Sequence, residues 1–144
     1  MRTLQLFAAL ALVSALAGCG SPDPVNATYN GMLAAGDKVL ETDNSLYDEY
    51  EFKAAEGWPI TITMTATAFD AYAHLIDADG NQLASDDDGA GGTNAKVTFV
   101  APKTGTYRAY ANSLSGGATG AYTLVVQAGP AGAAPAAPAA PAAH

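Results

Sequence analysis

The stretch PITITMTATAF, residues 59–69, decides the fold, because apolar and threonine side chains alternate along it. In an extended chain successive side chains point to opposite faces, so Ile60 and Ile62 share one face while Thr61 and Thr63 share the other. A period of two predicts a β-strand with one buried face and one hydrated face, and it does not fit an amphipathic helix.

Shorter segments on both sides repeat this alternation and predict further strands. They are YDEYEF (47–52), AYAHLID (71–77), QLA (82–84), AKVTFV (95–100), TYRAYA (106–111) and AYTLVV (121–126). Turn-forming residues, chiefly glycine, proline, aspartate and serine, separate them. Short strands divided by turns, without a strong helical stretch, predict an all-β fold, an antiparallel jelly-roll-like β-sandwich of about seven to eight strands.

Composition divides the chain into four regions. Residues 1–18 form an apolar leader, residues 19–36 a flexible tether rich in Gly, Pro and Asn, residues 37–127 the sandwich, and residues 128–144 a tail rich in Ala and Pro. The tail has no aromatic or acidic side chain, so it cannot build a core. We expect it to be disordered and to sample extended, polyproline-like conformations.

The leader has the pattern of an export signal. Arg2 precedes a run of Leu, Ala and Val that is shorter than the roughly 20 apolar residues of a membrane-spanning helix. The only cysteine follows at once, in Leu16-Ala17-Gly18-Cys19. This frame resembles the lipobox of bacterial lipoproteins, which implies cleavage before Cys19, a diacylglycerol on its thiol, and an acyl chain such as palmitate on the new amino terminus.

Lipidation would tie the protein to a membrane. Two or more acyl chains give stable anchoring, which one chain does not. Because the residue after Cys19 is Gly20 and not aspartate, the resemblance implies the outer membrane of a Gram-negative bacterium. The alternative is a soluble secreted protein whose cleavage site lies near a cysteine by chance, which would leave an unpaired thiol in an exported chain.

The charge of the chain excludes some partners. It carries 14 acidic and 6 basic side chains, for a net charge of −8, and the basic residues are scattered along the sequence. Binding to nucleic acid is therefore not expected. With one cysteine no internal disulfide can form, so burial of apolar side chains must hold the fold together.

Several segments resemble the bacterial pre-peptidase C-terminal domain. They run in order along residues 37–127: Phe69-Asp70, an Asp-x-Asp-Gly turn at 77–80, an acidic loop, Ala-Pro-x-x-Gly-x-Tyr at 101–107, and Gly-x-Tyr-x-Leu at 120–124. The resemblance implies a jelly-roll-like β-sandwich without catalytic activity, of the kind appended to secreted proteases. Because the sequence places a lipobox-like leader directly before this segment, we expect the module to stand by itself behind a lipid anchor, which does not fit a role beside a covalently attached protease.

Aspartates gather at two neighbouring places and are candidate calcium ligands. Asp77 and Asp79 lie in one turn, and Asp86, Asp87 and Asp88 lie in the next loop. Consecutive carboxylates repel one another, and a cation that prefers oxygen ligands, such as calcium, relieves that repulsion. The alternative is a hairpin turn followed by a hydrated acidic loop.

A second candidate calcium site follows from the resemblance. The collagen-binding modules of clostridial collagenases have a similar fold, and an acidic segment before their sandwich helps to hold calcium. Glu41, Asp43 and Asn44 resemble that segment, which otherwise forms only a turn before Tyr47.

Catalytic activity is not predicted. The sequence lacks Gly-x-Ser-x-Gly, and its two histidines, His74 in a predicted strand and His144 in the tail, lack the spacing of zinc ligands. The chain is therefore predicted to be a noncatalytic cell-envelope module that binds protein or polysaccharide and assists exported enzymes such as secreted proteases. Two alternatives are an envelope spacer and a small hydrolase that uses Asp70 with Asp86.

Overall fold

The computed structural model describes residues 20–132. The leader, the predicted lipidation site Cys19 and residues 133–144 of the tail lie outside the described residues. Within the described part, no helix is long and apolar enough to cross a membrane.

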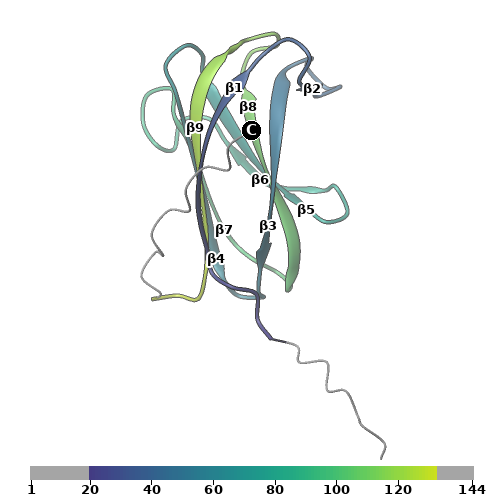
Figure 1. Ribbon diagram of the computed structural model, residues 1–144, viewed down its shortest axis with the longest axis vertical. Helices are drawn as coiled ribbons and strands as arrows, with labels where there is room; N and C mark the ends of the chain where they lie inside the picture. Colours follow the sequence, from purple (N-terminus) through teal and green to yellow (C-terminus); the bar gives the residue numbers. More distant parts are fainter. Residues whose placement is uncertain (1–19, 133–144) are drawn as a thin grey trace, which may run out of the picture.

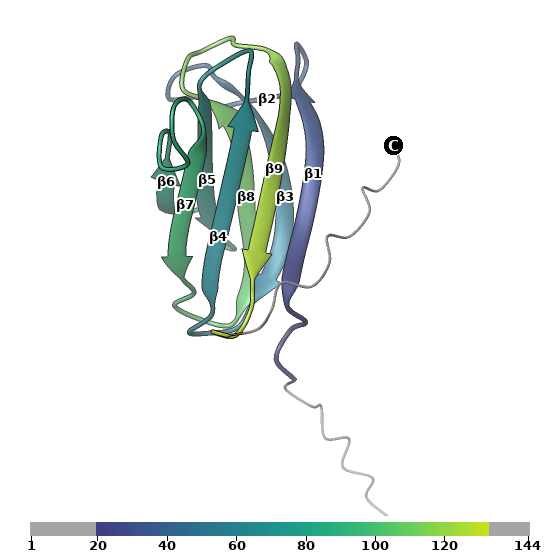
Figure 2. The same ribbon diagram turned by 90° about the vertical axis from the view of Figure 1, so that its left-hand side faces the viewer.

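The described residues form two antiparallel sheets packed face to face (Figure 1). The strands are β1 (Val25–Leu33), β2 (Lys38–Val39), β3 (Leu46–Ala54), β4 (Pro59–Ala66), β5 (Ala71–Asp77), β6 (Gln82–Asp86), β7 (Ala95–Val100), β8 (Gly105–Ser113) and β9 (Gly120–Ala128). One sheet has the order β1-β9-β4-β7 and the other β2-β3-β8-β5-β6, and Figure 2 shows the four-stranded sheet from its outer side. The predicted all-β sandwich is confirmed.

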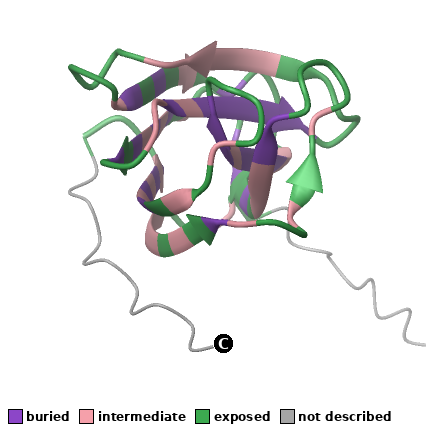
Figure 3. Cartoon of the chain, turned by 90° about the horizontal axis from the view of Figure 1, so that it is seen from above, coloured by how far each residue is buried: buried purple, intermediate pink, exposed green. Residues whose placement is uncertain are grey.

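The alternation in residues 59–69 produces β4. Ile60, Ile62 and Met64 are fully buried between the sheets, while Thr61 and Thr63 are half-buried on the outer side. Figure 3, seen from above, shows buried segments in both layers and exposed loops around them. All seven strands predicted from the sequence are present, and β4 ends at Ala66, before the end of its alternating stretch.

The tether prediction is wrong for residues 25–33, which form the edge strand β1. Val25 pairs with Ala128 and Leu33 with Gly120, so β1 is hydrogen-bonded along the whole of β9. The segment has few large apolar residues, but Leu33 is fully buried. Backbone pairing to β9 and inward packing therefore order a stretch whose composition is typical of a linker. With β2, also missed, the strand count is nine and the sandwich runs from Val25 to Ala128.

Tyr107 holds the turn that precedes β8. Its ring is buried, and its hydroxyl donates a hydrogen bond of 2.5 Å to the carbonyl oxygen of Lys103. The equivalent contact is absent at Tyr122, whose hydroxyl donates instead to the carboxylate of Asp48 on the opposite sheet. The two Gly-x-Tyr repeats in the sequence therefore place their tyrosine rings alike in the core and use the hydroxyls differently.

Tyr107→Phe should lower the free energy of unfolding by about 1 kcal/mol, because the Lys103 carbonyl loses its buried donor. Urea denaturation measures the change. Tyr47→Phe is the control, because Tyr47 lies half-exposed on the outer face of β3. Water reaches this position, so removing the hydroxyl leaves no buried group without a hydrogen-bond partner. Equal effects of the two substitutions would contradict this role of Tyr107.

Candidate functional site: a tyrosine-rich face

The two outer faces of the sandwich carry different side chains. On the four-stranded sheet, half of the outward residues of β4 and β9 are Thr, and the others are Pro59, Ala121, Val125 and Gln127. On the five-stranded sheet, the outward residues of β3, β5 and β8 are mostly tyrosines and charged residues. The second face therefore has the chemistry of a binding surface, because Tyr and Arg are enriched where proteins bind partners.

Strand register sets the outward residues of the five-stranded sheet in rows. Tyr47 on β3 and Tyr72 on β5 both pair with Asn112 on β8, which lies between them. In the next row, Tyr110 on β8 lies between Glu49 on β3 and His74 on β5. We call Tyr47, Tyr72, His74, Arg108 and Tyr110 the tyrosine face.

The aromatic rings of this face contact one another. Tyr47 stacks on Tyr110 with 4.5 Å between ring centroids and 26° between ring planes. The Tyr72 and His74 centroids are 4.2 Å apart, and His74 lies 6.5 Å from Tyr110. One ring face of Tyr47 packs against one ring face of Tyr110. These two residues therefore present mainly their ring edges and hydroxyls to the outside.

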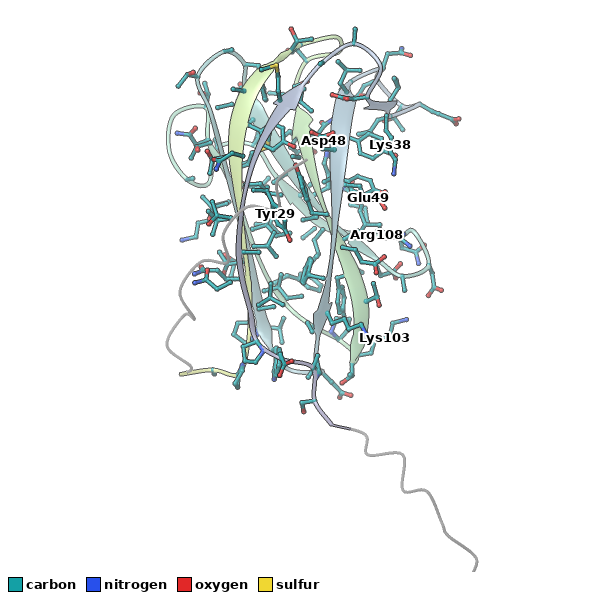
Figure 4. All side chains as sticks on the ribbon, in the orientation of Figure 1. Tyr29, Lys38, Asp48, Glu49, Lys103 and Arg108 are labelled. Atoms are coloured by element: carbon teal, nitrogen blue, oxygen red, sulfur yellow. The ribbon has the colours of Figure 1, made fainter. Side chains whose placement is uncertain are left out.

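Charged side chains border the rings. Lys38 Nζ lies 3.1 Å from Glu49 Oε2, and Arg108 Nε lies 3.6 Å from Glu49 Oε1 and 3.9 Å from Glu51 Oε2. The hydrogen bond from Lys38 to Glu49 is the main cause that raises the pKa of Lys38. Arg108 Nε is buried and makes no hydrogen bond despite its ion pairs. Figure 4 shows Lys38, Glu49 and Arg108 on the outer side of this sheet.

The His74 side chain is buried beneath the rings of the tyrosine face and is held there by hydrogen bonds. It is only 5% exposed, its Nδ1 lies 2.8 Å from Gln82 Oε1, and its Nε2 lies 3.5 Å from Asn112 Oδ1. The Asn112 amide in turn donates to Ser45 Oγ and to the Leu46 carbonyl oxygen. This packing gives His74 a structural role, and the network gives the tyrosine face a rigid base.

A second polar cluster lies between the sheets. The Tyr122 hydroxyl donates a hydrogen bond to the Asp48 carboxylate, and it lies 2.6 Å from the Tyr50 hydroxyl. The Tyr50 ring stacks on the Tyr29 ring with 4.2 Å between their centroids. Burial raises the pKa of Asp48 and, more strongly, that of Tyr122. Figure 4 shows Tyr29 and Asp48 on the two facing sheets. A tyrosine that ionises less readily is a poor nucleophile, so this cluster links the sheets and does not suggest catalysis.

The structure brings together one of the predicted acidic sets. Carboxylate oxygens of Asp86, Asp87 and Asp88 lie within 4.8 Å of one another, the only such group among the described residues. Asp86 Oδ2 also accepts hydrogen bonds from the backbone N–H groups of Gly89 and Lys96, which ties this loop to β7. These three residues fit the oxygen chemistry of calcium and retain free carboxylate oxygens to offer.

Asp77 and Asp79 do not join that group. Asp77 Oδ1 accepts from the backbone N–H groups of Asp79 and Asn81, and the Asn81 side-chain amide contacts both Asp77 carboxylate oxygens. Hydrogen bonding from the Asn81 side chain is the main cause that lowers the pKa of Asp77. Asp79 forms an exposed ion pair with Lys103 at 3.4 Å. The Asp-x-Asp-Gly segment therefore forms a hairpin turn, completed by Gly80 at a φ of 88°.

The segment with Glu41, Asp43 and Asn44 forms the turn between β2 and β3. Asp43 Oδ1 accepts from both the backbone N–H and the hydroxyl of Ser45, and the Ser45 hydroxyl is the main cause that lowers the pKa of Asp43. Asn44 adopts a left-handed φ of 58°. The Asp43 carboxylate is thus already engaged by Ser45 in a turn that needs no metal. This segment therefore fits calcium less well than the loop at Asp86.

Comparisons with known proteins agree with this fold. The family model described as the bacterial pre-peptidase C-terminal domain matches residues 46–113, which run from the first residue of β3 to the last residue of β8. This match covers the whole of the tyrosine face and leaves β1, β2 and β9 outside. No curated protein matches the chain.

Two solved structures show the same architecture. The pre-peptidase C-terminal domain of a collagenase from Bacillus anthracis has 27% sequence identity and a TM-score of 0.54, covering 71% of this chain and 89% of that one. PliG of Aeromonas hydrophila, a periplasmic inhibitor of g-type lysozyme, has 14% identity and a TM-score of 0.55, covering 72% of this chain and 86% of that one. The second likeness shows the fold alone.

Proposed function

We propose that the chain is a noncatalytic binding module of the bacterial cell envelope that contacts a protein partner through the tyrosine face. The observation that carries this proposal is the patch itself, three tyrosines and an arginine on one rigid sheet face. Tyr and Arg are enriched among the residues that dominate binding energy. The similar structure of the pre-peptidase C-terminal domain of a collagenase supports the proposal.

The face suits a protein better than a polysaccharide. Sugars stack on open, flat aromatic faces, whereas Tyr47 and Tyr110 stack on each other. The charges of Lys38, Glu49 and Arg108 border the rings, and charged groups around an aromatic centre set the orientation of a protein partner.

The proposed anchor is the lipid on Cys19, at the outer membrane of a Gram-negative bacterium. Only five residues, 20–24, separate Cys19 from the first residue of β1. Fully extended, they span at most about 18 Å. An anchor this short would hold the sandwich close to the membrane surface, so the partner would also be a protein at that surface.

A photocrosslinking experiment tests the partner. A photoreactive phenylalanine analogue replaces Tyr110 in the native bacterium, and the same analogue at Thr98, outward on the other sheet, is the matched control. We expect one discrete protein band from position 110 and none from position 98. A ladder of glycan-sized products from position 110 would instead indicate a polysaccharide ligand, and crosslinks from neither position would contradict the proposed face.

Tyr110→Ala should then weaken partner binding about 10-fold or more, because truncating an aromatic anchor costs over 1 kcal/mol of binding free energy. Titration of the identified partner measures the change, and Thr98→Ala serves as the control. Burial raises the pKa of the Tyr110 hydroxyl, so the anchor stays uncharged at physiological pH.

Calcium in the loop at Asp86, Asp87 and Asp88 remains a proposal. At millimolar calcium, relative to chelator, we expect the melting temperature to rise by about 5 °C, given the weak affinities typical of extracellular sites. Asp87→Asn combined with Asp88→Asn should abolish the rise. A rise that survives both substitutions would place the cation elsewhere, and no rise would remove the proposal.

A further inference from the structure

The outer side of the four-stranded sheet is a nearly neutral surface. Its outward residues are Asn26, Thr28, Asn30, Met32, Pro59, Thr61, Thr63, Thr65, Lys96, Thr98, Val100, Ala121, Thr123, Val125 and Gln127, which we call the threonine face. Lys96 is the one charged side chain among them, in a chain with a net charge of −8. Met32 and Val100 are 61% and 59% exposed, near opposite ends of the face.

The chain leaves β9 in the direction of this face. After Ala128, the backbone bends at Pro130 and turns at 131–132, where Gly132 has a φ of 90°. Figure 1 shows this end of the described chain on the outer side of the four-stranded sheet, away from β3. The described chain therefore ends beside one end of the threonine face, on its outer side (Figure 1).

The segment beyond the turn has chemistry that matches the face. Residues 133–143 contain only Ala and Pro, with Pro135, Pro138 and Pro141 spaced three apart. A polyproline II helix has three residues per turn, so prolines at this spacing share one side. Its backbone makes no internal hydrogen bonds, and its carbonyl groups can accept from the hydroxyl and amide donors that the face offers.

The length of the segment also matches. From Ala128 back to Ala121, seven residues of strand span about 24 Å. From Ala133 to Pro141, eight steps of polyproline II span about 25 Å. Pro141 therefore reaches the level of a shallow depression lined by Asn30, Met32, Thr65, Asn94, Ala121 and Thr123.

We propose that residues 133–144 bind back along the threonine face of the same molecule, in a polyproline II conformation, and end at this depression. The bound segment covers Met32, and its carbonyl groups accept hydrogen bonds from threonine hydroxyls other than that of Thr123, which donates to Asn30. The threonine face is then closed to other partners and to a second copy, which leaves the tyrosine face as the open surface. This proposal does not depend on the proposed function.

Spin labelling of the tail tests the proposal in the full chain. Cys19→Ser removes the native thiol, and Ala143→Cys carries a nitroxide label that broadens the NMR signals of nearby residues. We expect loss of most signal intensity at Met32 and Ala121, with Tyr47 and Tyr110 unaffected. Broadening at both faces alike would mean a free tail and would overturn the proposal.

Two further samples make the test specific. Replacing Pro135, Pro138 and Pro141 with glycine keeps the length but removes the polyproline preference, so the signals at Met32 and Ala121 should recover. In a mixture of isotope-labelled protein without nitroxide and nitroxide-bearing protein without isotope, no broadening is expected. Broadening in the mixture would show that the tail binds another copy of the protein. Unchanged broadening in the glycine variant would show that the prolines are not recognised. Either result would overturn the proposal.

Discussion

Replacing Gly31 with alanine is expected to lower the free energy of unfolding by about 3 kcal/mol. A Cβ atom at Gly31 would lie 2.3 Å from both Cζ and the hydroxyl oxygen of Tyr122, far inside van der Waals contact. The Tyr122 ring cannot swing away, because it is only 4% exposed and its hydroxyl contacts Asp48 and Tyr50. Either β1 moves off the sandwich or the hydrogen bonds between the sheets break.

A second strand glycine supplies the control for this substitution. Gly105, the first residue of β8, has no atom within 4 Å of the position its Cβ would take. Gly105→Ala should change stability by less than about 1 kcal/mol, and in the stabilising direction if it acts mainly on the unfolded chain. Urea denaturation of both variants measures the difference, and similar midpoints for the two would show that the packing of Gly31 against Tyr122 is not tight.

The seven strands predicted from sequence were those with a strong alternation or a run of β-branched and aromatic residues. In β4, the inward positions Ile60, Ile62 and Met64 are fully buried, because strand geometry alone assigns alternate residues to opposite faces. Local patterns predicted local structure.

Strand β1 could not be predicted in this way, because its order comes from a distant partner. Nothing within residues 25–33 indicates that Gly31 leaves room for Tyr122, which lies on β9 at the other end of the sequence. Gly and Asn lower the strand propensity of the segment, and backbone pairing along nine residue pairs outweighs that preference.

The tyrosine face was missed for a related reason. The sequence shows that Tyr47, Tyr72 and Tyr110 lie in strands, and alternation puts Tyr47 opposite in phase to the inward Phe52. The alternation of inward and outward residues within each strand could have indicated that its tyrosine points outward. The strand order β3-β8-β5 is needed as well to place Tyr47, Tyr110 and Tyr72 side by side. The acidic residues were easier to find and harder to interpret, because turn carboxylates such as Asp77 resemble metal ligands in sequence.

Tyr122→Phe should cost about 2 kcal/mol of unfolding free energy at neutral pH. The hydroxyl of Tyr122 donates to the Asp48 carboxylate between the sheets, and its loss leaves a partly buried charge without that donor. In an Asp48→Asn background the same substitution should cost less, about 1 kcal/mol, because the group left without a partner is then neutral. A double-mutant cycle measures the coupling between the two residues.

The pH dependence of stability provides an independent test of this cluster. Burial raises the pKa of Asp48 above its ordinary value of 3.8, so the folded protein binds this proton more tightly than the unfolded chain. The stability that results is complete below the unfolded pKa and is lost as pH rises through the folded pKa. Asp48→Asn removes that loss, and its stability relative to the wild type should therefore rise from pH 4 toward pH 7. Carboxylates that do not interact with Asp48 contribute equally to both proteins and cancel in the comparison. The charge of Asp37 raises the pKa of Asp48 in the wild type alone, which acts in the same direction as burial. A difference that stays constant across this range would mean that Asp48 ionises in the folded protein as it does in the unfolded chain, with no cost from burial between the sheets.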